Sequence, residues 1–328
     1  MDLSTTYMGL KLKNPLVVSS SPITAKIETI WECADRGAGA VVLKSLFEEQ
    51  IVAEIKARLS KEEMFFWYPE AMDHVSTISR GQGVKNYLRL IEKAKQHTNI
   101  PIIASINCIT PNEWTYIARE LENSGADGLE LNIGKLASDD QDPGAKTERY
   151  IEIIEAVKTE VKLPIAVKIG PYFSNLTYTV NKLCHSGINA VVLFNRFYRP
   201  DIDINKLTLI ESSALSAPEE LLQSLRWIAL LSNKVECDLA ASTGIHDYDG
   251  VVKQLLAGAN ATYLCTTLLK NGIDYLQTIL IGLERWMAQH NFETISEFKG
   301  LISKRHNLTP EFVRVQYMKK STEEVALY

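Results

Sequence analysis

The chain has no long apolar run, no basic amino-terminal segment and no closely spaced pair of cysteines. A membrane-spanning helix needs about 20 consecutive apolar residues, and a signal peptide starts with basic residues, so neither is expected. The five cysteines are widely spaced, and none forms a Cys-x-x-Cys motif. We therefore expect no metal site and no iron–sulfur cluster, and a cytoplasmic chain with reduced cysteines is the simplest expectation.

Positive charge is also limited. The 328 residues include 35 Lys and Arg against 40 Asp and Glu, which gives a net charge of −5. Because no basic cluster offsets this balance, nucleic acid is not an expected partner. The hydrophobic content of 46% is ordinary for a globular protein that buries a large core.

Strand-like and helix-like segments alternate along almost the whole chain, with no change of composition that would divide it. The strand-like runs are 16–20, 38–44, 101–106, 128–132, 164–168, 188–194, 237–241 and 261–265. Eight β-then-α units predict an α/β fold with a single (β/α)8 TIM barrel over residues 1–328, closed by helices near 275–287 and 296–302. Two longer segments, 48–80 and 196–217, are expected as loop insertions on the carboxyl face. A doubly wound sheet is the alternative, but its glycine-rich first turn is absent after the first two strands.

Polar residues follow the carboxyl ends of five predicted strands: Ser20, Lys44, Asn132, Lys168 and Asn195. Barrel enzymes keep their chemistry on this face. Lys44 and Lys168 each end an apolar run that should be buried, and a buried ammonium is unfavourable unless an anion pairs with it. We therefore expect both lysines to face a ligand.

The last two strands end in short hydroxyl-rich turns, Ser242-Thr243-Gly244-Ile245 and Cys265-Thr266-Thr267. In (β/α)8 barrels the loops after strands seven and eight commonly bind a phosphate group. Hydroxyl groups, together with backbone amides that Gly244 leaves accessible, can hold such a dianion. The sequence therefore predicts a phosphate site here.

Taken together, these segments resemble the dihydroorotate dehydrogenase family, the class 1-like FMN-containing barrels that also include the flavin domain of dihydropyrimidine dehydrogenase. The resemblance depends on the order and spacing of several short motifs. They are Met-Gly-Leu-Lys-Leu-Lys-Asn-Pro at 8–15, Val-Leu-Lys-Ser at 42–45, Glu-Leu-Asn at 130–132, Val-Lys-Ile-Gly-Pro-Tyr at 167–172, Phe-Asn at 194–195, Ser-Thr-Gly-Ile at 242–245 and Cys-Thr at 265–266.

The resemblance implies FMN as cofactor and assigns a role to each matching position. Ser20 would lie against the flavin, Lys44 would approach the ring and substrate, and Lys168 would face the N1/O2 edge. Asn132 and Asn195 would hydrogen-bond the flavin or a planar substrate. The phosphate would be held by Thr243, Gly244, Cys265 and Thr266.

One motif departs from the family pattern. Where the family has Asn-x-Ser-Cys-Pro-Asn, with Cys as the catalytic base, this chain has Asn132-Ile-Gly-Lys-Leu-Ala137. Lys135 replaces the base. It could act as a base if burial lowers its pKa from the usual value of about 10.4, or as a proton donor to a C=C bond under reduction. It could equally be a solvent-exposed lysine paired with Asp139 or Asp140. These alternatives stay open.

Two further features bear on the substrate and the assembly. Arg196, directly after Asn195, could bind a substrate carboxylate. The aromatic cluster Phe65-Phe66-Trp67-Tyr68 could be a lid over the flavin or a dimer contact. Exposed aromatic patches favour an interface, so a homodimer is expected.

The sequence as a whole predicts an FMN-dependent oxidoreductase of pyrimidine metabolism. It would act on a CH–CH bond of a small planar substrate similar to dihydroorotate or a dihydropyrimidine, with hydride transfer to or from flavin N5. Two alternatives differ in class. One is a barrel lyase or aldolase in which Lys168 or Lys135 forms a Schiff base. The other is a non-catalytic flavin-binding subunit.

Overall fold

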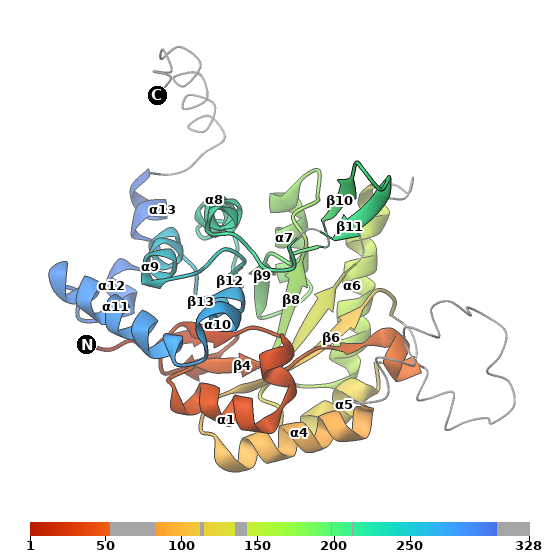
Figure 1. Cartoon of the computed structure of the whole chain (residues 1–328). Coiled ribbons are helices and arrows are strands. Elements are labelled where there is room, and N and C mark those ends of the chain that lie inside the picture. The colour runs from red at the N-terminus through yellow and green to blue at the C-terminus, as the bar shows by residue number, and fades with distance from the viewer. Residues whose placement is uncertain (53–82, 112–114, 135–142, 198, 212, 307–328) are drawn as a thin grey trace, which may run out of the picture.

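The computed structural model describes residues 1–52, 83–111, 115–134, 143–197, 199–211 and 213–306. A ring of parallel strands stands in the middle of the molecule, and helices surround it (Figure 1). The predicted TIM barrel is confirmed.

Eight parallel strands form the barrel wall, and each lies beside the next in space. In order around the barrel they are β3 (Leu16–Val18), β4 (Ala40–Val42), β6 (Ile102–Cys108), β7 (Gly128–Ile133), β8 (Ile165–Ile169), β9 (Ala190–Leu193), β12 (Asp238–Ser242) and β13 (Ala261–Leu264). The ring closes because β13 pairs with β3, and β4 pairs with β6. A two-residue strand, β5 (Leu46–Phe47), adds to the carboxyl end of β6.

The strands are nearly continuous apolar runs because both of their faces are covered. Side chains that point outward pack under the helices, and those that point inward fill the barrel. The inward set is dominated by small or branched residues: Val17, Ala40, Val42, Ile103, Ala166, Ala190, Val192, Ala240 and Ala261. Buried polar side chains also enter the interior: Ser105 and Glu130 at mid-height, and Lys168 and Ser242 toward the carboxyl end.

Helices connect successive strands on the outside of the barrel. Those before the last strand are α1 (Ile27–Asp35), α4 (Val84–His97), α5 (Ile117–Asn123), α6 (Pro143–Glu160), α7 (Leu176–His185), α8 (Leu221–Leu231) and α9 (Tyr248–Ala257). Helix α4 is a clear case of amphipathic packing, because Val84, Tyr87, Ile91 and Ala94 lie on one buried face. After β13 come α10 (Thr266–Asn271), α11 (Tyr275–Gln289), α12 (Ile295–Phe298) and α13 (Leu301–His306).

An amino-terminal hairpin closes the bottom of the barrel. Strands β1 (Thr5–Tyr7) and β2 (Leu10–Leu12) pair across a turn at Met8 and Gly9, both with positive φ. Tyr7, Met8 and Leu12 are buried among the inward-facing barrel residues. The Tyr7 hydroxyl lies 3.0 Å from the hydroxyl of Tyr263 on β13, which ties the two ends of the chain together.

The insertion between β9 and α8 forms a second hairpin, β10 (Pro200–Asp203) and β11 (Thr208–Glu211). It stands away from the barrel strands at the upper right of Figure 1. After it, a single 3-10 turn, η2 (Pro218–Glu220), leads into α8. A similar turn, η1 (Pro22–Ala25), precedes α1.

One helix prediction differs from the structure. A single helix was expected over 296–302, where the chain forms α12 and α13 instead. Gly300 separates them with a φ of +72°, a left-handed conformation that an α-helix cannot contain.

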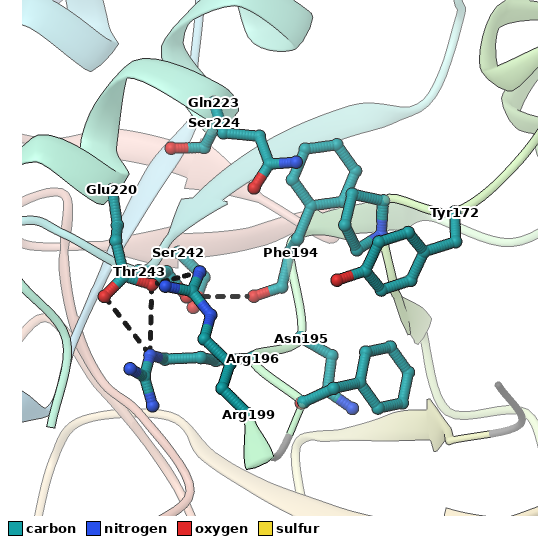
Figure 2. A pocket seen from close by; sticks show the side chains of 12 residues that line it. Tyr172, Phe194, Asn195, Arg196, Arg199, Glu220, Gln223, Ser224, Ser242 and Thr243 are labelled. Atoms are coloured by element: carbon teal, nitrogen blue, oxygen red, sulfur yellow. Dashed lines mark hydrogen bonds and ion pairs between the residues drawn. The ribbon is translucent and has the colours of Figure 1, made fainter. Parts of the chain in front are cut away.

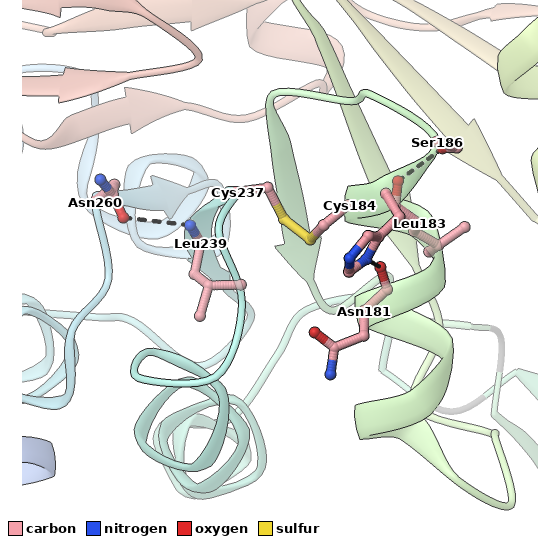
Figure 3. The surroundings of a disulfide bond; sticks show 8 residues. Asn181, Leu183, Cys184, Ser186, Cys237, Leu239 and Asn260 are labelled. Atoms are coloured by element: carbon pink, nitrogen blue, oxygen red, sulfur yellow. Dashed lines mark hydrogen bonds between the residues drawn. A yellow bond between two sulfur atoms is a disulfide. The ribbon is translucent and has the colours of Figure 1, made fainter.

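The expectation of uniformly reduced cysteines is wrong for one pair. Cys184 at the end of α7 and Cys237 just before β12 form a disulfide, 53 residues apart in sequence (Figure 3). They meet because α7 leads into β9, and β9 lies beside β12. Cys33, Cys108 and Cys265 are free.

Within the described part of the chain, no helix combines the length and the apolar character needed to cross a membrane. The same part holds no cluster of three or more His, Cys, Asp or Glu side chains suited to a metal ion.

Candidate active site

A cavity of about 210 Å³ opens at the carboxyl ends of the barrel strands. Its wall comes from the ends of five strands, β3, β8, β9, β12 and β13, and from the loop before η2. The lining residues are Ser19, Ser20, Lys168, Phe194, Asn195, Arg196, Ala214, Ser216, Ser242, Thr243, Gly244, Ile245, Tyr263, Cys265 and Thr266. Eight of the predicted site residues therefore meet around one space: Ser20, Lys168, Asn195, Arg196, Thr243, Gly244, Cys265 and Thr266.

Lys168 supplies the positive charge at the floor of the cavity. It is the fourth residue of β8, so the barrel wall covers its side chain, which is 7% exposed. Its Nζ lies 5.7 Å from the centre of the Tyr263 ring. Among the described residues, no carboxylate lies within ion-pair distance of this ammonium, which leaves its charge for an anionic ligand.

Two amides stand beside this charge. Asn195 Nδ2 donates a 2.8 Å hydrogen bond to Asn132 Oδ1, which joins the ends of β7 and β9, the two strands on either side of β8. Asn107 on β6 is in register with Asn132, and Asn132 is in register with Lys168 on β8. A planar ligand that carries alternating donors and acceptors can hydrogen-bond to such a row.

The turn after β12 has the shape of an anion cradle. Thr243 and Gly244 both have positive φ, +76° and +78°, and Thr243 Oγ1 donates to the carbonyl oxygen of Phe194. Gly244 packs so closely on η2 that an added Cβ would lie 2.1 Å from the backbone nitrogen of Leu221. Successive residues in this conformation point their amides the same way and form a concavity for anions.

Hydroxyl groups complete the cradle from two directions. The Thr266 hydroxyl accepts a hydrogen bond from the Ser216 amide at 3.1 Å and lies 3.0 Å from Ser216 Oγ. His246 Nε2 lies 3.4 Å from that same Ser216 oxygen, and burial and Lys270 lower the pKa of the His246 ring. Burial also raises the pKa of the Cys265 thiol. The surroundings are therefore polar but mostly uncharged at neutral pH.

A smaller cavity lies behind Asn195 and Arg196, under the start of α8 (Figure 2). Arg196 Nε is 3.0 Å and Arg199 Nη2 is 2.7 Å from the same oxygen of Glu220. Burial alone would raise the pKa of Glu220, but the Ala217 amide and the two guanidinium groups outweigh it, and the pKa is lowered. Arg196 therefore lies at the edge of the main cavity, and its Nε is paired with Glu220.

Not every predicted residue lies in this cavity wall. Lys44 follows β4 and is half-buried, but it is not among the residues that line the cavity. Asn132 does not line the cavity either and reaches it only through its hydrogen bond with Asn195. Lys135, with the acidic turn after it, lies outside the described residues, as do Phe65–Tyr68.

Sequence reasoning missed several residues of the site. Asn107 carried the same signal as Asn132, because it directly follows an apolar strand, and it could have been found. Tyr263 lies two residues before Cys265 on the inward face of β13, so the alternation of a strand also pointed to it. Ser216 had no local signal, because it belongs to an irregular loop.

The arrangement fits a planar cofactor that carries a phosphate group. The cavity wall holds an ammonium that has no carboxylate partner among the described residues, and a cradle of amides and hydroxyls in which a Cβ at position 244 would not fit. FMN has both parts, so the predicted cofactor suits the donor set of this cavity.

Fold and cavity together define the class of protein, a (β/α)8 barrel enzyme with its ligand site at the carboxyl ends of the strands. A family model described as dihydroorotate dehydrogenase matches residues 2–287. The chain therefore belongs to the dihydroorotate dehydrogenase family, as the resemblance of its motifs predicted. Members of this family are flavin-dependent dehydrogenases, so the prediction of an enzyme is confirmed.

Individual relatives match over most of this chain. The catalytic subunit of dihydroorotate dehydrogenase B (NAD(+)) from Thermoplasma volcanium is 27% identical, covering 93% of this chain and 99% of the relative. The NAD-dependent dihydropyrimidine dehydrogenase subunit PreA of Escherichia coli is 24% identical, covering 94% and 78%. A crystal structure of DHODH from Eimeria tenella with ferulenol has a TM-score of 0.69 at 14% identity, covering 92% and 88%, which supports the fold alone.

Proposed function

We propose that the chain is an FMN-dependent oxidoreductase that acts on a CH–CH bond of a small planar substrate, dihydroorotate or a related dihydropyrimidine. Residues 1–328 would act as one FMN-binding domain. The observation that carries the proposal is the cavity itself, with the uncompensated ammonium of Lys168 opposite the Thr243–Gly244 cradle.

Each part of the cavity has a task in this reaction. FMN held here would supply hydride transfer at N5, with negative charge at its N1/O2 edge in the reduced form. Lys168 would stabilise that charge, since a preorganised cation in a site with little water acts strongly. Asn132 and Asn195 would orient the planar rings, Ser20 would lie against the flavin and Lys44 would approach the substrate. Thr243, Gly244, Cys265 and Thr266 would hold the phosphate.

Lys135 would exchange the proton that accompanies the hydride, because it takes the position of the family's catalytic Cys. An amine and a thiol differ in charge at every stage of proton transfer. Together with Ala137 in place of the substrate-binding Asn, this difference favours a substrate that is not dihydroorotate itself. Arg196 would meet an acidic group of the substrate at the cavity edge.

Identification of the flavin, followed by an anaerobic substrate screen, tests the proposal. Purified protein should release FMN, and its absorbance should bleach with one of dihydroorotate, dihydrouracil, NADH or NADPH. Lys135→Ala should slow bleaching at least about 100-fold, the usual size of a general acid–base contribution, and leave FMN bound. Failure to take up FMN would overturn the proposal. FMN that none of these donors reduces would point to a non-catalytic flavin-binding subunit.

The lyase or aldolase alternative is separated by borohydride trapping. A Schiff-base enzyme would give a stable adduct at Lys168 or Lys135 with a carbonyl substrate, whereas the flavin mechanism gives none.

The proposal includes a cytoplasmic enzyme that associates with other chains. Some relatives are named as subunits, so an electron-transfer partner is part of the proposal. We also propose a homodimer, with the β10–β11 hairpin as contact surface. Its side chains Ile202, Ile204, Leu207 and Leu209 are 60–83% exposed, an apolar patch that association would cover.

A further inference from the structure

Glu130 is a buried carboxyl group below the cavity floor. It is the third residue of β7 and alternates with Asn132, so it points into the barrel two residues below the row of amides. Its side chain is fully buried. Neither carboxyl oxygen has a hydrogen-bond partner among the described residues.

The groups that face Glu130 come from several elements. Ser105 on β6 is the register partner of Glu130, and Tyr263 comes from β13. Lys168 lies on β8, two residues beyond Ala166, which is the register partner of Glu130 on that strand. Tyr7 from the bottom hairpin and Tyr87 from α4 also feel its charge. Of these groups, Lys168 alone carries a positive charge.

An ionised Glu130 would be poorly supported in this place. A carboxylate without hydrogen bonds in a dry interior is strongly disfavoured, and the group takes up a proton instead. Burial accordingly raises the pKa of Glu130. Lys168, together with the hydroxyls of Tyr263 and Ser105, which lie near the carboxyl group without meeting hydrogen-bond geometry, lowers this pKa by less. Burial raises the pKa of Tyr7, Tyr87 and Tyr263 as well, so all three phenols are neutral.

We infer that Glu130 is a positioning residue held as a neutral acid beneath Lys168, so that the lysine presents a full, uncompensated positive charge to the anion bound in the cavity. An ionised Glu130 would reduce the combined charge of Glu130 and Lys168 from +1 to zero. The protein would thus keep a carboxyl group next to Lys168 without cancelling the charge of that lysine.

A row of hydroxyl groups runs from the cavity toward this acid. Ser20, in the cavity wall, lies 3.1 Å from Ser45 Oγ, which lies 2.8 Å from Ser105 Oγ. Ser105 in turn is the register partner of Glu130 across the β6–β7 pair. The row therefore ends beside Glu130 without a hydrogen bond to either of its carboxyl oxygens.

Infrared spectroscopy of protein labelled with 13C-carboxyl glutamate tests the protonation state directly. At pH 7 we expect the carbonyl band of an un-ionised glutamic acid, and Glu130→Gln should abolish it. Glu48→Gln is the matched control, because Glu48 is also buried but accepts hydrogen bonds from the amides of Ile109 and Thr110 at 2.7 and 3.1 Å. Absence of the band from wild-type protein, or its persistence in Glu130→Gln, would overturn the inference without any variant having to bind flavin.

The affinity for FMN gives a second test, which rests on the proposed function. At pH 7, Glu130→Gln should bind FMN within about twofold of wild type, because one neutral group replaces another. If Glu130 were ionised, its removal would tighten binding about tenfold for each pKa unit of coupling with Lys168, and that result would refute the inference. As pH rises until Glu130 ionises, wild-type affinity should fall more steeply than that of Glu130→Gln. FMN that binds to none of the proteins would instead refute the proposed function, and the infrared band would still decide the state of Glu130.

Discussion

Gly244 shows how one residue type makes the phosphate cradle possible. Its φ of +78° is unfavourable for other residues, and the backbone of Leu221 fills the space where a side chain would begin. Both constraints arise because the loop after β12 packs against the end of η2. The cradle can therefore approach an anion through backbone amides alone.

Gly244→Ala should damage the site more than its backbone conformation explains. Gly9→Ala is the matched control, because Gly9 has nearly the same φ, +77°, and open space around its missing Cβ. We expect Gly9→Ala to lower the free energy of unfolding by about 1–2 kcal/mol and leave FMN affinity unchanged. Gly244→Ala should in addition weaken FMN binding at least about tenfold, or about 1.4 kcal/mol. Denaturant titration measures the free energy of unfolding, and flavin fluorescence measures the affinity for FMN. Equal FMN affinities of the two variants would contradict the proposed cradle.

At the residue scale the sequence predicted those groups that lie directly after a strand. Lys168 and Asn195 were found because an apolar run locates the strand and its end locates the cavity. Glu130 was visible only as a polar residue within an alternating strand, and nothing local marked it as unpartnered. That property depends on which side chains β6, β8 and β13 bring to it across the barrel.

On the scale of elements, the loop after β9 is fastened to η2 by ion pairs. Glu220 forms ion pairs with both Arg196 and Arg199 (Figure 2). Its carboxylate also accepts a 2.9 Å hydrogen bond from the Ala217 amide. The loop that carries Asn195 and the turn that contacts Gly244 are thereby held at a fixed spacing. One carboxylate links the substrate side of the cavity to its phosphate side.

Glu220→Gln should loosen this link in a pH-dependent way. The pKa of Glu220 is lowered on folding, so its stabilisation is present above the unfolded value of about 4.5 and is lost as pH falls through the folded value. The variant should therefore be less stable than wild type at pH 7, by roughly 1 kcal/mol, and equally stable in acid. Glu219→Gln, at an exposed neighbouring position, is the control. A stability difference that does not shrink in acid would contradict the ion pair as its source.

The Cys184–Cys237 disulfide joins α7 to the start of β12 at the amino end of the barrel strands, away from the cavity (Figure 3). It closes a loop of 53 residues, and such a loop is expected to contribute about 2–4 kcal/mol to stability. Cys184→Ser should therefore lower the midpoint of denaturation without altering FMN affinity. Reductant should lower the wild-type midpoint equally and leave the variant unchanged. A wild-type midpoint insensitive to reductant would mean that the thiols are not joined in solution.

Element positions could be predicted because parallel barrel strands are short apolar runs and their helices are amphipathic. Starts and ends were less predictable. Gly300 splits one expected helix into α12 and α13, because its φ of +72° cannot continue an α-helix. Only a loop insertion was expected where the β10–β11 hairpin forms. The two strands of this hairpin expose their apolar residues and have no buried face, so the sequence does not mark them as strands.

For the whole molecule, the exposed side of that hairpin predicts the oligomeric state. Ile204→Asp with Leu209→Asp should turn the proposed dimer into a monomer, because charges would have to be buried in the contact. Leu222→Asp on α8, at a position 64% exposed, should leave the assembly unchanged. Light scattering after size-exclusion chromatography distinguishes the two. A wild-type monomer would remove the hairpin from consideration as a homodimer surface.

The seam between β3 and β13 has a consequence for synthesis of the protein. Leu16 pairs with Thr262, so the barrel cannot close until almost the whole chain has left the ribosome. At about 5–20 residues per second, the roughly 250 intervening residues need about 12–50 s. Throughout that time β3 presents an unpaired edge of Leu16, Val17 and Val18, which in the finished barrel are completely buried. The nascent chain thus has a long interval in which its first barrel strand is exposed to aggregation, and protection by a chaperone would act there.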